Sequence, residues 1–303
     1  EWDHNVIYVG NGEKTVRGNV SSGDGIWKSV NAGKTWEAMG LKNARHIPRI
    51  RIHPKNPDIV YAGVMGDLYK SSDERGVFKS IDGGKTWSKK LFANKDAGVV
   101  DLIIDPNNSR VLYATTWNIR RTPYSLSSGG DGSALWKSTD EGETWINIST
   151  NKGLPTGLWG ISGVTVSPVN SEIVWALIEN EKGGIYKSTD AGKTWKHIGL
   201  EASRHISDII IHPNNPDIFY VTVQGSQYGP SLQRGVYRTQ DGGTNWQRVL
   251  YVDDITGASS LSMDMNNPRI LYASMWQHQR YPWIMESGGD TSGLYKSTDG
   301  GST

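Results

Sequence analysis

One short pattern recurs six times along the chain and constrains the fold more than any other feature. It has the form S-x-D-x-G-x-T-W, as in "STDAGKTW" at residues 188–195. Successive copies are separated by 51, 58, 50, 51 and 58 residues, which indicates a repeating unit of about fifty residues. The copies begin at Ser29, Ser80, Ser138, Ser188, Thr239 and Ser297.

A second, longer period lies over the first. Shifting the chain by 159 residues aligns "RHIPRIRIHPKNPDIVYAGV" (45–64) with "RHISDIIIHPNNPDIFYVTV" (204–223). The same shift aligns "DPNNSRVLYATTW" (105–117) with "DMNNPRILYASMW" (264–276). A block of three units, residues 24–144, is therefore repeated at residues 183–303.

Each unit has the pattern of four short strands. In residues 204–250, "HISDIIIHP", "IFYVTV", "GVYRT" and "NWQRVLY" are rich in β-branched and aromatic residues and are separated by turn-forming segments. Four-stranded units of this length predict an all-β fold, a β-propeller, with residues 1–303 as a single propeller. Six blades are visible. The first lacks its first strand and the sixth lacks its fourth, so ring closure stays open.

The repeated pattern is the Asp-box, and the chain resembles the Asp-box (BNR-repeat) propeller superfamily over nearly its whole length. That superfamily includes bacterial sialidases, xyloglucanase-type glycoside hydrolases, sortilin-type receptor propellers and photosystem II assembly factors. The repeat texture, as in "GGIYKSTDAGKTW", is most similar to secreted bacterial proteins of the sortilin-like and glycosyl-hydrolase-like kind. The resemblance implies the fold and an extracellular or periplasmic location, and leaves the function open.

The aspartates of the Asp-boxes are predicted to frame turns rather than to catalyse a reaction. Each precedes a glycine in a tight turn, where a short carboxylate can accept hydrogen bonds from nearby backbone N–H groups. One such residue in every blade suits a structural role and no chemical one. The residues are Asp82, Asp140, Asp190, Asp241 and Asp299, with Asn31 in the first copy.

Candidate ligand-binding residues gather in the long, variable loops between second and third strands. Two of these loops, "TTWNIRRTPYSLSSGGDGSA" (115–134) and "SMWQHQRYPWIMESGGDTSG" (274–293), combine aromatic rings with planar donors. Such a combination suits sugars, peptide backbones or carboxylates. We expect Trp117 and Trp276 to hold the ligand, the alternative being that both pack inward over the blades. The further candidates are Arg120, Arg121, Tyr124, His278, Arg280, Tyr281 and Trp283.

A second candidate region is the mouth of the central channel, where the first strands begin. Arg45–His46 and Arg204–His205 stand there at matching places in the two halves, which suggests a site for an anion or polar ligand. The alternative is a solvated channel with structural salt bridges. The channel positions themselves are Arg49, Asp101, Gly163, Asp208 and Ser260.

The positions of the carboxylates distinguish a catalytic function from a binding function. A glycosidase needs two, about 5–5.5 Å apart if retaining or ~6.5–9.5 Å if inverting. The weak candidates are Glu13, Asp24, Asp101 and Asp208, with Asp67, Glu74 and Glu286 behind them. The essential Asp of xyloglucanase-type enzymes lies in an R-T-D-x-G-G-like stretch that is missing here, and "HIPRI" (46–50) lacks the Arg that precedes Ile-Pro in sialidases. The sequence thus favours a recognition propeller, with a polysaccharide-active glycoside hydrolase as the alternative.

Charge and composition limit the classes of partner that the chain is expected to bind. The net charge is +1, which argues against a nucleic-acid binder that relies on bulk charge. No apolar run approaches the ~18 residues needed to span a membrane. No metal or cofactor motif stands out, since "GGDGS" and "GGDTS" are explained as glycine-rich turns. We therefore expect a protein, peptide or oligosaccharide ligand, no cofactor, and room for further domains in a larger chain.

Overall fold

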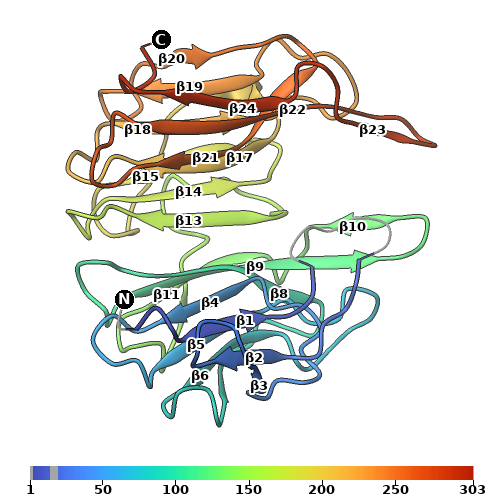
Figure 1. Ribbon diagram of the computed structural model, residues 1–303, viewed down its shortest axis with the longest axis vertical. Helices are drawn as coiled ribbons and strands as arrows, with labels where there is room; N and C mark the ends of the chain where they lie inside the picture. Colours follow the sequence, from blue (N-terminus) through green and yellow to red (C-terminus); the bar gives the residue numbers. More distant parts are fainter. Residues whose placement is uncertain (1–2, 14–19, 303) are drawn as a thin grey trace.

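The computed structural model describes residues 3–13 and 20–302, and these are built almost entirely from antiparallel β-sheet (Figure 1). Six sheets follow one another along the chain, and we number them as blades one to six. Figure 1 shows blades one to three in the lower half of the view and blades four to six in the upper half. The predicted all-β propeller architecture is confirmed.

Within each blade the strands pair in sequence order, except that in blades three and six the long second strand pairs both with its hairpin extension and with the strand that follows. Blade one contains β1 (Ile7–Gly10), β2 (Ile26–Ser29) and β3 (Glu37–Ala38). Blade two contains β4 (Arg49–Ile52), β5 (Val60–Val64), β6 (Gly76–Ser80) and β7 (Ser88–Leu91). Blade three contains β8 (Ala97–Ile104), β9 (Leu112–Arg121), β10 (Leu126–Ser128), β11 (Ala134–Ser138) and β12 (Ile146–Asn147).

The second half repeats this order. Blade four contains β13 (Ser162–Val166), β14 (Val174–Ile178), β15 (Gly184–Ser188) and β16 (Lys196–His197). A 3-10 turn, η1 (Glu201–Ser203), leads to blade five, with β17 (Ile206–Ile211), β18 (Phe219–Val223), β19 (Gly235–Thr239) and β20 (Gln247–Leu250). Blade six contains β21 (Thr256–Met263), β22 (Leu271–Arg280), β23 (Met285–Ser287) and β24 (Gly293–Ser297). The strands expected in residues 204–250 correspond to β17 to β20.

The hydrophobic core lies between blades rather than within them. Between blades three and four, for example, Tyr113 and Leu135 pack against Val164, Val174 and Tyr186. Similar clusters join blades one and two, two and three, four and five, and five and six. Each blade is therefore stabilised by burying the faces of its sheet against the next blade.

A polar contact links each of these pairs of blades on the Asp-box side. The hydroxyl of Tyr113 donates a hydrogen bond to the carbonyl of Ala191 in the next blade (3.1 Å), and Lys137 Nζ donates to the same carbonyl (2.7 Å). In blade four Trp175 takes the place of the tyrosine, and its buried Nε1 has no hydrogen-bond partner. There the contact with blade five is made by Lys187 Nζ alone, which donates to the carbonyl of Gly242 (3.4 Å). The equivalent tyrosines are Tyr8, Tyr61 and Tyr220, which donate to Gly83, Glu141 and Gly300.

The Asp-box carboxylates act within their own turns, as predicted. Asp190 accepts hydrogen bonds from Ser188 Oγ (2.8 Å), from the Thr194 N–H (2.8 Å) and from Thr194 Oγ1 (2.6 Å). Burial pushes the pKa of Asp190 upward, but these hydrogen bonds outweigh it and hold the pKa at about 2. The same set of bonds surrounds Asp82 and Asp140. The geometry gives these aspartates a framing role.

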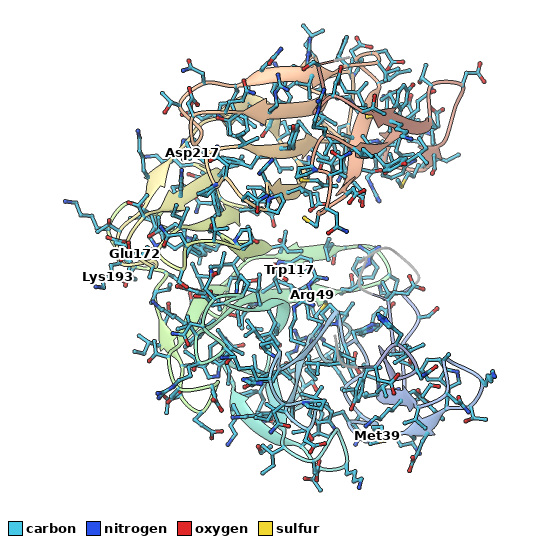
Figure 2. All side chains as sticks on the ribbon, turned by 60° about the vertical axis from the view of Figure 1, so that its left-hand side comes forward. Met39, Arg49, Trp117, Glu172, Lys193 and Asp217 are labelled. Atoms are coloured by element: carbon cyan, nitrogen blue, oxygen red, sulfur yellow. The ribbon has the colours of Figure 1, made fainter. Side chains whose placement is uncertain are left out.

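The Asp-boxes and the turns between first and second strands share one face of the molecule. The N–H of Ala191 donates to the carbonyl of Glu172 (2.8 Å), and the N–H of Gly242 donates to that of Asp217 (3.0 Å). Figure 2 shows Glu172, Lys193 and Asp217 along the same side of the molecule. Because strands alternate in direction, the long loops between second and third strands lie at the opposite ends of the blades. We call that side the loop face.

Candidate functional site

Two hairpin arms project from the loop face. The first arm, residues 117–130, is the end of β9 folded back as β10, and the second arm, residues 276–289, is the end of β22 folded back as β23. Figure 1 shows both extending to the right, beyond the bodies of their blades. The arms are copies of one another at the offset of 159 residues, and they contain most of the predicted ligand-binding residues.

The tip of each arm is a two-residue turn with proline first and an aromatic residue second. In the first arm, the hydrogen bond from the Thr122 N–H to the Ser125 carbonyl (2.9 Å) closes the turn around Pro123 and Tyr124. Tyr124 is 90 % exposed and Trp283, at the equivalent position, is 81 % exposed. In the second arm Tyr281 stacks with Trp283, their ring centroids 6.0 Å apart and their planes 19° from parallel. The tips thus present flat aromatic surfaces to solvent.

The two tryptophans at the bases of the arms brace the hairpins. Trp117 Nε1 donates to Ser128 Oγ (2.9 Å), and Trp276 Nε1 donates to Ser287 Oγ (3.1 Å). Trp117 is only 5 % exposed and packs in a cluster with Met65, Leu68, Val100 and Ile119, so the inward alternative describes it. Trp276 is half-buried and stacks on His278, with the ring centroids 4.2 Å apart. The burial of Trp117 leaves no exposed ring face for a ligand, contrary to our expectation.

The charged candidates of the arms differ in exposure. Arg120 and Arg280 are exposed, whereas Arg121 is half-buried. His278 is 3 % exposed, its Nδ1 lies 3.4 Å from Arg234 Nη1, and burial lowers its pKa. The structure therefore places Arg120 and Arg280 at the surface with the aromatic tips, and it corrects the prediction for His278, which is an internal group.

Two buried arginines, which the sequence analysis missed, hold the arms in place. Arg75 is 0 % exposed and donates to the carbonyls of Asp67 (2.6 Å) and Asp96 (2.9 Å), and at 3.5 Å to that of Ile119 in the first arm. Burial lowers its pKa to about 10, so the guanidinium stays charged at neutral pH. Arg234 occupies the matching position and donates to the carbonyls of Ser226 (2.6 Å) and His278 (3.5 Å). The matched "ERGVFKS" and "QRGVYRT" segments were the available signal.

Among the predicted channel positions, Asp101 ties three blades together. Its Oδ1 accepts from Arg49 Nε in blade two (2.7 Å), and its Oδ2 accepts from the Val164 N–H in blade four (3.1 Å). The Arg49–Asp101 ion pair is thus a structural contact between blades, as the alternative prediction for these positions had it. Asp208 is half-buried and accepts from the N–H of Ile209 (3.0 Å).

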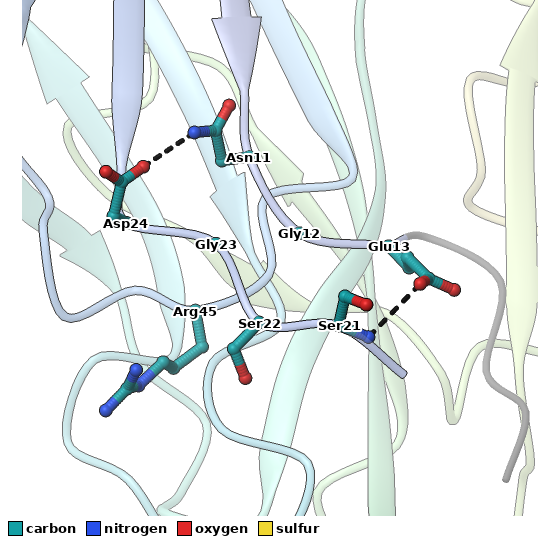
Figure 3. Close-up of a pocket in the computed structure, with 8 residues that line it drawn as sticks. All are labelled: Asn11, Gly12, Glu13, Ser21, Ser22, Gly23, Asp24 and Arg45. Carbon is teal, nitrogen blue, oxygen red and sulfur yellow. Dashed lines mark hydrogen bonds between the residues drawn. The ribbon is translucent and has the colours of Figure 1, made fainter. Parts of the chain in front are cut away.

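A hollow on blade one is lined by two further candidates, Glu13 and Asp24 (Figure 3). Asp24 accepts from Asn11 Nδ2 (2.6 Å) and from Trp27 Nε1 (2.9 Å), and these bonds, that of Trp27 first, lower its pKa. Glu13 accepts from the Ser21 N–H (3.2 Å) across the same loop. Both carboxylates therefore shape the long loop of blade one, and Figure 3 shows Arg45 on its border.

The Arg-His pairs are matched in backbone but not in environment. Arg45 and Arg204 both have left-handed backbones, with φ of 61° and 62°, and both side chains are exposed. His46 is 0 % exposed, and neither ring nitrogen has a hydrogen-bond partner. His205 is exposed, and its Nδ1 lies 3.0 Å from the carbonyl of Gly225. The structure thus corrects the prediction for His46, which is buried and offers no surface to a ligand.

Neither the pKa values nor the hydrogen bonds of the described carboxyl groups mark two of them as an acid–base pair. A glycosidase general acid needs a raised pKa. Every described carboxyl whose pKa departs clearly from its ordinary value is shifted downward. Asp24 and Asp101 are held in structural hydrogen bonds, and Asp67 accepts the N–H of Tyr69 (2.9 Å). Glu74 is half-buried and Glu286 is exposed on the second arm.

Within residues 3–13 and 20–302, no group of three or more His, Cys, Asp or Glu side chains is placed to hold a metal ion. A search of the same ranges finds no helix with the length and apolar character required to cross a membrane.

The chain is similar to proteins named xyloglucanases and matches a sortilin family model. The xyloglucanase Xgh74A of Acetivibrio thermocellus is 25 % identical over an alignment covering 82 % of this chain and 31 % of that enzyme. A xyloglucanase of Paenibacillus sp is 27 % identical over 36 % of this chain and 10 % of the enzyme. This chain thus spans less than a third of the length of these relatives.

Two solved structures share the fold over almost the whole chain. An ancestral GH74 enzyme superposes with a TM-score of 0.64 at 18 % identity, covering 97 % of this chain and 37 % of the enzyme. The GH74 xyloglucanase of Xanthomonas campestris superposes with a TM-score of 0.61 at 16 % identity, covering 99 % of this chain and 43 % of the enzyme. The family model described as "Sortilin, neurotensin receptor 3" matches residues 24–183 and 183–303. The chain therefore belongs to the Sortilin-Vps10 family.

Proposed function

We propose that this protein acts on polysaccharides, holding a glycan chain against the tips of its two arms. The observation that carries the proposal is the exposed aromatic ring at the same turn position of each arm, Tyr124 and Trp283. Sugar rings have apolar C–H faces that stack on flat aromatic side chains, and the exposed guanidinium groups of Arg120 and Arg280 add planar hydrogen-bond donors. The similarity to xyloglucanases supports a glycan as the ligand.

Hydrolysis of O-glycosidic bonds is the activity that we propose for this protein. It replaces a purely binding role as the preferred interpretation because the similar proteins that cover most of this chain are named xyloglucanases. All four weak candidates, Glu13, Asp24, Asp101 and Asp208, accept hydrogen bonds from other groups, so none of them is singled out. Each is changed in turn, beginning with Asp208 and Glu13. We place the reaction outside the cytoplasm, where polysaccharide substrates lie.

The test is release of new reducing ends from xyloglucan, mixed-linkage β-glucan, galactomannan and polygalacturonate. Activity on one polymer that falls by 10²-fold or more in Asp208→Asn or Glu13→Gln supports hydrolysis by that carboxylate. Asp217→Asn, on the Asp-box face, is the control. Polymer binding without product release keeps the glycan ligand and removes hydrolysis from the proposal.

Binding of a protein or peptide is the second candidate, and membership of the Sortilin-Vps10 family favours it. It would use the same exposed aromatic tips, since tyrosine and tryptophan are enriched in protein interfaces. Failure of the folded protein to bind any polysaccharide of the panel, together with capture of a peptide through Tyr124 and Trp283, would establish this candidate instead.

A further inference from the structure

We infer that the two arms grip a single glycan chain at two separate points, so that the protein selects long polymers over short oligosaccharides. The inference rests on the proposed polysaccharide function and adds to it the length of the ligand and the way it is held. It follows from the duplication of the arms, their rigid attachment and the difference between their tips.

The duplication preserves the internal bonds of the arms as well as their outline. In the first arm the Gly129 N–H donates to the Asn118 carbonyl (2.9 Å), and in the second the Gly288 N–H donates to the Gln277 carbonyl (2.9 Å). The indole–serine brace described above is likewise present in both arms. The two arms therefore present Tyr124 and Trp283 at the same turn position of matching hairpins.

Each arm is also fastened to the long loop of the preceding blade. The N–H of Arg121 donates to the carbonyl of Leu68 (2.8 Å), and that of Arg280 donates to the carbonyl of Gln227 (2.7 Å). Behind these bonds lie the buried guanidinium groups of Arg75 and Arg234. Rings held on a fixed frame lose little conformational entropy when a ligand binds, so even a small contact area can contribute to affinity.

The tips differ in ways that suit two different positions along one chain. The first arm carries Arg120 and a single ring, Tyr124, whereas the second has Gln279 in place of the arginine and a stacked pair, Tyr281 and Trp283. Both arms carry an exposed guanidinium, that of Arg120 in the first and that of Arg280 in the second, but the second tip offers the larger aromatic platform. Two unlike grips also give a bound polymer one preferred direction.

Bivalent binding predicts a strong dependence on ligand length. Once one arm holds a polymer, the second contact becomes intramolecular, and linked contacts of this kind can raise the apparent affinity by 10²–10⁴-fold over either contact alone. A short oligosaccharide that cannot reach both tips gains nothing from the second arm. It instead occupies each arm separately.

The experiment compares the best-bound polymer of the panel with a short oligosaccharide made from it, by isothermal titration calorimetry. The variants are Tyr124→Ala and Trp283→Ala, whose side chains are too exposed to contribute much to folding. Tyr272→Ala is the control, because Tyr272 lies on β22 with Trp283's arm but near the Asp-box end of that strand.

We expect each single-arm variant to bind the polymer about 100-fold more weakly. For the oligosaccharide we expect two sites in the unchanged protein and one in each variant, with the affinity of the remaining site kept within about threefold of its original value. The control should match the unchanged protein in both. If a polymer binds but loses no more affinity than the oligosaccharide does, the two-point grip is wrong and the polysaccharide function stands. If no polymer of the panel binds to the folded protein, the proposed function itself fails.

Discussion

The contact between Tyr113, Lys137 and the carbonyl of Ala191 offers a quantitative test of how the blades are held together. Tyr113→Phe removes one hydrogen bond of 3.1 Å from a side chain that is 0 % exposed, while Lys137 Nζ still donates to the carbonyl at 2.7 Å. We expect a loss of about 1 kcal/mol in the free energy of unfolding. Lys137→Met removes the charged donor and should cost about 1.5–3 kcal/mol.

The double variant should cost more than the sum of the two single ones. With both donors removed, the carbonyl of Ala191 keeps neither of its interblade partners, and leaving a partly buried acceptor unpaired carries a further cost. We expect a coupling energy of about 1 kcal/mol, measured by urea unfolding of all four proteins in a double-mutant cycle. The matched control is Tyr272→Phe, at the equivalent position of blade six, where the tyrosine is exposed and the change should stay within about 0.5 kcal/mol. Additive single effects, or an equal loss in the control, would refute the argument.

Three further predictions concern the Asp-boxes, the buried arginines and the base of the first arm. Hydrogen bonds from Thr86 and Ser80 hold the pKa of Asp82 at about 2, below about 3.9 in an unfolded chain. The stability they add is therefore complete above pH ~4 and lost as the pH falls through about 2. Over this range the free energy of unfolding, measured in urea, should change less with pH in Asp82→Asn than in the unchanged protein. Arg75→Lys should cost ~2–4 kcal/mol in the free energy of unfolding, because one ammonium group cannot reach all the carbonyls to which the guanidinium donates. The control Arg120→Lys changes an exposed side chain and should cost almost nothing. An equal loss in both variants would contradict the role of Arg75 in holding the first arm in place. Trp117→Ala should cost ~3–5 kcal/mol in the free energy of unfolding, and because the indole braces the first arm, any loss of polysaccharide affinity should accompany this loss of stability. Weaker binding at unchanged stability would return Trp117 to the ligand site.

The repeats made most of the fold predictable. The spacing of the Asp-boxes and the alternating apolar segments were enough to place β17 to β20 within a few residues, because one register must serve all six blades. The framing role of Asp190 followed in the same way, since a residue repeated in every turn serves the turn.

The site was less predictable, because composition does not show on which side of a hairpin a ring lies. Trp117 and Tyr124 belong to the same aromatic segment, yet the indole packs inward against Leu68 while the phenol at the turn points to solvent. The role of Arg75 was hidden for a related reason. Its partners are backbone carbonyls of three separate segments, and a sequence carries no mark of an acceptor that every residue possesses.

The most direct test of the central claim is affinity electrophoresis of the protein in gels containing each polysaccharide of the panel. The account predicts that at least one polymer retards the unchanged protein, and that the double variant Tyr124→Ala/Trp283→Ala migrates through the same gel without retardation. Equal retardation of both proteins would contradict the arms as the glycan site. Free migration of the folded, unchanged protein in every gel would contradict a polysaccharide function altogether.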